Sequence, residues 1–101
     1  MIKHIVMFKL LPQAQGRTAA ENAALALTML EQFPAQIPTL QDFRAVVNAP
    51  DASADNCELA LICTFADMDG LNAYQIHPVH KNFGAFISQV RASRACIDFA
   101  E

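Results

Sequence analysis

The sequence predicts a single α+β domain in which strands and helices follow one another in the order βαββαβ. The chain has 101 residues, the usual size of one domain, and contains no repeat, linker or low-complexity tract. Its first and last apolar segments alternate with the period of two that is typical of strands. Between them lie two segments with helix-starting signals and helical spacing of the apolar residues. These observations indicate one domain, residues 1–101.

The first two elements are a strand and a helix. Residues 2–10 are predicted to form a strand with apolar side chains on both faces at its centre. Thr18 and Glu21 have the spacing of a capping box, which begins a helix. An apolar stripe continues to Phe33, and Pro34 is expected to end the helix because proline cannot continue it.

Two strands are predicted in the middle of the chain, at residues 40–47 and 57–65. They are separated by residues 48–56, a segment of small and polar residues with helix and strand breakers, which indicates an exposed loop. The second of these strands contains the uninterrupted apolar run 59–63. Such a run is typical of a strand that is buried on both faces.

The last part of the chain is predicted to be helical and then extended. Asp67 or Asp69 can cap a short helix. Pro78 then begins another helix, at about residues 79–91, because proline is favoured at the first helical position. The final strand is predicted at residues 94–99, with Ala95, Ile97 and Phe99 on one face and Arg94, Cys96 and Asp98 on the other.

This order of elements predicts a ferredoxin-like fold, a four-stranded antiparallel sheet with the helices on one face. The other face is then uncovered, and we expect it to carry Val6, Phe8, Ile62 and similar residues. The chain is 53% hydrophobic and only 17% charged, which is more apolar than a small monomer requires. The sequence therefore predicts a homodimer in which two sheets meet face to face as a dimeric α/β barrel.

The overall charge and hydropathy argue against several classes of partner. The net charge is −3 and the seven Lys and Arg are scattered, so no nucleic-acid partner is expected. No apolar run approaches the roughly 20 residues of a membrane span, so no membrane partner is expected either. Lys3, His4 and Lys9 interrupt the first apolar run and no cleavage site follows it, which argues against a signal peptide and favours the cytoplasm.

The three cysteines, Cys57, Cys63 and Cys96, are odd in number and form no CxxC pair. They lie in apolar strand segments, where a free cysteine behaves as a small buried hydrophobic residue. We therefore expect core cysteines, with neither a disulfide framework nor a zinc site built on the thiols.

The segment from Tyr74 to His80 holds the only tyrosine and two of the three histidines. His80 lies in the first turn of the helix begun by Pro78, where the helix dipole disfavours protonation and keeps the ring available as a base. Such a base could remove a proton next to a carbonyl group while Tyr74 donates to the developing oxyanion. The alternative is that His80 only caps the helix or packs near a cavity.

The other two histidines have less specific interpretations. His77 precedes a proline, which places it in the turn, where its ring is expected to bind backbone groups. His4 lies on an apolar strand face and is either a hydrogen-bonded core residue or a cavity-lining proton carrier. His77, His80 and His4 could also ligate a metal, but no carboxylate accompanies them, so neither a metal nor a cofactor is predicted.

Two acidic residues of the strands, Glu58 and Asp98, need partners if the sheet buries them. Arg44 or Arg94 could pair with them, and ion pairing is the expectation. The alternative is that one of these arginines steers an anionic ligand.

The opening Ile-Lys-His-Ile-Val with Phe8-Lys9-Leu10, the Tyr-X-X-His-Pro-X-His segment at 74–80 and the closing Asp98-Phe99 resemble the stress-responsive A/B barrel (Dabb) family. The resemblance covers the whole chain in its order of elements and implies the dimeric α/β barrel. Many members of this family are known mainly as small stress-responsive dimers.

The family also implies candidate site residues. One plant member is a cofactor-free polyketide cyclase that performs an intramolecular aldol condensation in the barrel cavity. The resemblance places its essential tyrosine and histidine at Tyr74 and His80, and a further histidine at His4. Leu59 and Leu30 stand where that enzyme has another cavity histidine and tyrosine, so its particular substrate is not expected here.

Two functions follow from this reading. The first is a homodimer of undetermined activity that binds a small hydrophobic ligand in the cavity. The second is a cofactor-free lyase, cyclase or isomerase acting on a carbonyl compound, with His80 as base, Tyr74 as acid and His4 as a further catalytic residue. Oxygenase or haem-degrading activity, found in the wider superfamily, is not favoured, because the chain has no tryptophan and only His80 on its last helix.

Overall fold

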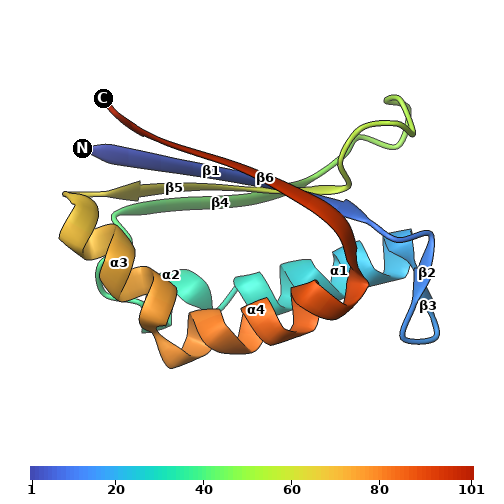
Figure 1. The fold of residues 1–101 in the computed structure, drawn as a ribbon, viewed down its shortest axis with the longest axis horizontal. Helices are drawn as coiled ribbons and strands as arrows, with labels where there is room; N and C mark the ends of the chain where they lie inside the picture. The colour runs from blue at the N-terminus through green and yellow to red at the C-terminus, as the bar shows by residue number, and fades with distance from the viewer.

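A computed structural model describes residues 1–101 and contains a four-stranded antiparallel sheet in the order β4-β5-β1-β6 (Figure 1). The strands are β1 (Ile2–Leu10), β4 (Asp42–Val47), β5 (Leu59–Phe65) and β6 (Arg91–Ala100). Strands β1 and β5 are central, and β4 and β6 are the edges. The predicted ferredoxin-like α+β fold is confirmed, with strand boundaries that differ from the expected ones by up to three residues.

All helices lie on one face of this sheet (Figure 1). They are α1 (Ala19–Leu30), α2 (Phe33–Gln36), α3 (Met68–Ile76) and α4 (Pro78–Val90). The segment before α1 contains a small hairpin of β2 (Gln13–Ala14) and β3 (Arg17–Thr18), whose turn has positive φ angles at its two central residues. None of the helices combines the length and the hydrophobicity of a transmembrane span.

Local signals in the sequence set the helix starts. The Thr18 hydroxyl accepts a hydrogen bond from the Glu21 amide, and the Glu21 carboxylate accepts one from the Thr18 amide, as the capping box predicts. Asp67, rather than Asp69, caps α3 by accepting from an amide of its first turn. Helix α1 ends at Leu30, earlier than expected. Pro34 does not end it but lies in the first turn of α2, where a missing amide hydrogen costs nothing.

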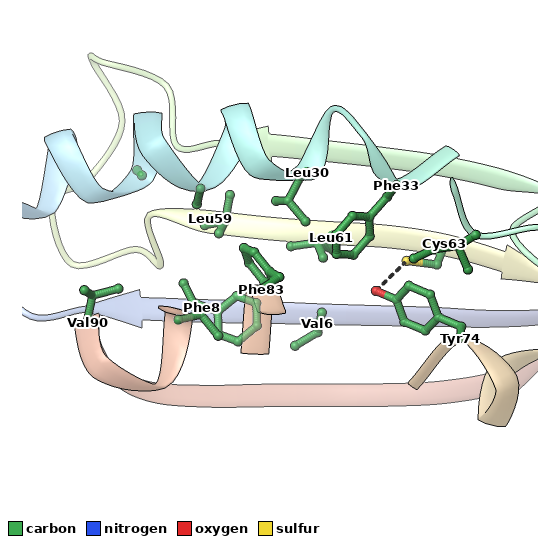
Figure 2. Packing of buried hydrophobic residues seen from close by; sticks show 14 of the residues in the cluster. Val6, Phe8, Leu30, Phe33, Leu59, Leu61, Cys63, Tyr74, Phe83 and Val90 are labelled. Carbon is green, nitrogen blue, oxygen red and sulfur yellow. Dashed lines mark hydrogen bonds between the residues drawn. The ribbon is translucent and has the colours of Figure 1, made fainter. Parts of the chain in front are cut away.

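The hydrophobic core lies between the helices and the inner face of the sheet, and Figure 2 shows strand residues meeting Leu30 and Phe83. Val6 and Phe8 belong to this core and are 3% and 4% exposed. The expectation that they lie on the uncovered face was therefore wrong. Alternation in β1 defines two faces, and the helices cover the one that carries the even-numbered residues.

The outer face of the sheet has no helix over it. At its centre Ile5 of β1 pairs directly with Ile62 of β5 and with Ile97 of β6, so three isoleucines lie in one row. Met7, Ile97 and Phe99 on this face are 43%, 58% and 38% exposed. Ile62 thus lies where the sequence predicted it, and the outer face is apolar.

The cysteines are all free, but only Cys63 is fully buried. Cys57 is half-buried and Cys96 is exposed, which contradicts the expected core position of Cys96. The reason is the strand order, because β6 is an edge strand and all of its residues except the first are exposed.

Candidate functional site

A cavity of about 310 Å³ lies between the sheet and the helices α3 and α4. The three site residues predicted from the sequence all line it, although they come from three different elements: His4 from β1, Tyr74 from α3 and His80 from α4. The apolar part of the wall consists of Val6, Phe8, Leu61, Phe83 and Ile87.

Tyr74 lies at the centre of an aromatic cluster and is 1% exposed. Its ring centroid is 4.5 Å from that of His80 and 5.1 Å from that of Phe65, both in inclined orientations. Its hydroxyl oxygen is 3.9 Å from the Cys63 sulfur, which donates to it (Figure 2). Burial raises the pKa of the phenol and raises that of the Cys63 thiol to about 12, so both groups stay protonated near neutral pH.

His80 lies in the first turn of α4, as predicted, and is half-buried. Its pKa is lowered, first by burial and then by the charges of neighbouring groups, among them His4 and Arg94. The prediction of a neutral ring is supported, but desolvation is the main cause and the helix dipole is not needed to explain it. The ring centroids of the neutral imidazole and the protonated phenol are 4.5 Å apart, so the two rings are in contact, and both line the cavity from which a ligand could reach them.

His77 has a structural role. Its Nδ1 accepts a hydrogen bond from the Val79 amide at 3.1 Å and so caps the N-terminus of α4. His77 does not line the cavity. The prediction that its ring binds backbone and shapes the turn is confirmed.

His4 is 2% exposed, and its Nδ1 lies 2.5 Å from Oδ1 of Asp98. The two residues are 94 positions apart but face each other directly in the β1–β6 pairing. Glu58, which directly precedes β5, lies 2.9 Å from the Lys9 ammonium and accepts from the Leu10 amide at 2.8 Å.

The expected pairing of these acids with Arg44 or Arg94 was therefore wrong, because the strand register brings each acid to another partner first. Sequence reasoning also gave no role to Gln75 and Arg91, which line the cavity.

His4, Cys96 and Asp98 place a nitrogen, a sulfur and an oxygen within 4.8 Å of one another. This donor set suits zinc chemically, and the sulfur lies 3.5 Å from His4 Nδ1 and 3.8 Å from Asp98 Oδ1. Two ligand atoms of a tetrahedral zinc would be roughly 3.3 Å apart, whereas His4 and Asp98 approach to 2.5 Å. His4 and Asp98 therefore form a hydrogen-bonded pair. A cation at this place would have to displace the proton between them and move the two side chains apart. The histidine set considered from the sequence is not assembled, because His77 caps α4.

Comparison with known proteins agrees with this architecture. A dimeric ferredoxin-like protein of unknown function from Thermobifida fusca is 30% identical, with a TM-score of 0.83 over 99% of this chain and 90% of that one. A dimeric protein of unknown function from Bacteroides fragilis is 26% identical, with a TM-score of 0.79 over 99% and 95%. The hydroxynitrile lyase of Passiflora edulis has the same fold at 12% identity, with a TM-score of 0.73 over 97% and 90%.

No curated protein matches the chain in sequence. The model of the stress responsive A/B barrel domain matches residues 2–101, almost the full length. The sheet order, the helices on one face and this match agree with one another, and the chain belongs to the stress responsive A/B barrel domain (Dabb) family.

Proposed function

We propose that the protein binds a small, largely apolar molecule in the cavity between the sheet and helices α3 and α4. The observation that carries this proposal is the convergence of His4, Tyr74 and His80 on one cavity whose remaining wall is mainly apolar. Ligand sites in proteins are usually concave and apolar, with a few polar groups that orient the ligand. A volume of about 310 Å³ is at the lower end of the usual range for such sites.

Cofactor-free lyase, cyclase or isomerase chemistry on a carbonyl compound is the second candidate. It is favoured by the neutral His80 ring lying next to the protonated phenol of Tyr74. In this reaction His80 would take a proton from the carbon next to the carbonyl, and Tyr74 would donate a hydrogen bond to the oxyanion that forms. The proton held by His80 would then return to the product. That a hydroxynitrile lyase has this fold at 12% identity supports only the capacity of the fold for such chemistry.

His4 would have a supporting part in this site. The hydrogen bond between Nδ1 and Asp98 leaves Nε2 as the ring nitrogen that this carboxylate does not engage. Burial of the ring and a charged partner hold it in one orientation beside Tyr74, with the two ring centroids 6.0 Å apart.

The proposal includes a homodimer formed through the outer face of the sheet. That face has the row of Ile5, Ile62 and Ile97 at its centre and exposes large apolar side chains around it. Exposed apolar areas of this kind mark interaction surfaces. The Thermobifida and Bacteroides proteins of the same fold are described as dimeric, which supports the same arrangement here.

The cavity function is tested by comparing His80→Ala with Lys81→Ala, its matched control. Lys81 is the next residue of α4 but is exposed and does not line the cavity. Both variants are expected to fold, and a panel of polyketide-like ketones and enol lactones is then scored for binding by amide shifts of cavity residues and for turnover. We expect altered affinity or lost turnover in His80→Ala alone. Binding and turnover equal to those of the control would remove His80 from the proposed function.

A further inference from the structure

The basic groups of the chain are unevenly distributed with respect to the cavity. The protein has a net charge of −3 and four arginines, at positions 17, 44, 91 and 94. Two of them, Arg91 and Arg94, line the cavity together with the imidazoles of His4 and His80, and no acidic residue lines it. The cavity is therefore a basic site in an acidic protein.

Neither cavity arginine has an acidic partner. The basic groups that lie within 4.0 Å of a carboxylate are those of Lys3, His4 and Lys9, and no arginine is among them. Asp98, the acid on the same face of β6 as Arg94, has its Oδ1 at hydrogen-bonding distance from His4. The two guanidinium groups thus have hydrogen-bond donors in a planar fork and no carboxylate to receive them.

The arginines are also well placed along the cavity. Arg94 pairs with Phe8 in the β1–β6 ladder, four residues before Asp98, which corresponds to about 13 Å along the strand. Arg91 directly follows the end of α4, whereas His80 lies in its first turn, about 16 Å away along the helix axis. Phe8 and Phe83, whose ring centroids are 6.2 Å apart, lie between Val90, the last residue of α4, and Tyr74 (Figure 2).

The charge of Arg94 is felt at the other end of the cavity. Burial is the main cause of the pKa shifts of both His80 and Tyr74. The charge of Arg94 also contributes, because it lowers the pKa of His80, which favours the neutral ring, and opposes the rise in the pKa of Tyr74. A negatively charged group beside Arg94 would therefore lie within electrostatic reach of the proposed proton-transfer pair. This places anion binding and the Tyr74–His80 pair in one site.

We propose that the cavity binds an oxyanion on an apolar body, a carboxylate or a phosphate ester, with Arg91 and Arg94 holding the anion and Phe8, Phe83 and Ile87 contacting the body. The inference rests on the proposed ligand-binding function and names its substrate class. In such a complex the uncharged part of the ligand reaches Tyr74 and His80. Arginine is the residue best suited to this task because its fork matches two oxygens of a carboxylate or phosphate.

The test uses three probes of one chain length: octanoate, octyl phosphate and octanamide. Their affinities are measured from amide shifts of cavity residues in the intact protein, in the variants Arg91→Gln, Arg94→Gln and both together, and in Lys81→Gln. The last variant removes one positive charge from the exposed side of α4 and serves as the control. Shorter and longer acids, from butanoate to decanoate, with their amides, cover the length of the cavity.

We expect at least one of the anions to bind ten- to a hundredfold more tightly than its amide, which is roughly the effect of a charge-assisted hydrogen bond. This preference is expected to vanish in the double variant and to persist in Lys81→Gln, with amide affinity unchanged throughout. The better of octanoate and octyl phosphate identifies the anion. Equal binding of amide and anion would overturn the anion inference and leave the ligand-binding function intact. No cavity shift with any probe would overturn both.

Discussion

Replacing Tyr74 by phenylalanine removes one hydroxyl group and leaves the aromatic ring that fills the core beneath the helices. The only hydrogen bond of that hydroxyl is the contact at 3.9 Å with the Cys63 thiol, which is a weak donor. The substitution removes a buried hydroxyl together with its weak hydrogen bond, so it has little effect on stability. We expect the free energy of unfolding to stay within about 1 kcal/mol of the wild-type value. The proposed proton donor would nevertheless be gone.

Truncating the same side chain to alanine has a different consequence. The ring is 1% exposed and contacts the rings of Phe33, Phe65 and His80 at centroid distances of 6.0, 5.1 and 4.5 Å. Removing a buried aromatic ring costs about 3–5 kcal/mol. For a domain of this size that corresponds to a fall in the melting temperature of at least about 12 °C.

Thermal and urea unfolding followed by circular dichroism measure both effects, and cavity ligand binding or turnover is measured on the same samples. The expected result for Tyr74→Phe is wild-type stability with impaired turnover. A loss of 3 kcal/mol in Tyr74→Phe would refute the reasoning, because the hydroxyl would then be structural. A double-mutant cycle with Cys63→Ala checks this directly, since the coupling energy between the two groups is expected to be close to zero.

Three further predictions concern the dimer, the sheet and the first helix. Ile97→Asp places a charge in the isoleucine row of the outer face, and sedimentation is expected to change from a dimer to an 11.0 kDa monomer. An 11.0 kDa wild-type species at micromolar concentration would contradict the proposed dimer. Although burial raises the pKa of Glu58, the Leu10 amide and the Lys9 ammonium lower it overall, so its stabilising effect is present above the ordinary pKa of 4.5 and disappears as the pH falls through the lowered value. Urea unfolding of Glu58→Gln should accordingly show a deficit of about 1 kcal/mol at pH 7 that shrinks as the pH falls below 4.5. A deficit independent of pH would contradict this assignment. Thr18→Ala removes the capping hydroxyl of α1 and is expected to cost about 1 kcal/mol in the same assay, whereas Thr28→Ala, a control in the interior of α1, should cost less.

Much of the site could be predicted because its signals are local. The capping box at Thr18, the helix start at Pro78 and the position of His80 in the first turn depend on residues only a few positions apart. The role of His77 follows in the same way from the proline after it. Short-range sterics and hydrogen bonding determine such features, and the sequence displays both partners together.

The partners of the acidic residues were not predictable in this way. Asp98 lies 94 residues from His4, and only the register of β6 against β1 brings them together. Pairing with Arg44 or Arg94 is equally compatible with the residue types, so the sequence alone offered no reason to prefer His4. The exposure of Cys96 likewise depends on β6 being an edge strand, which is a property of the sheet order.

The amino-acid sequence by itself determined the order of elements, the helix caps and the two residues, Tyr74 and His80, that lie side by side at the α3–α4 turn. Only the tertiary structure decided which face of β1 the helices cover, that His4 joins this pair, and that Arg91 and Arg94 line the same cavity. The physical reason is that alternation along a strand defines two faces without saying which is buried. That choice is made by packing and strand register, which depend on the whole chain.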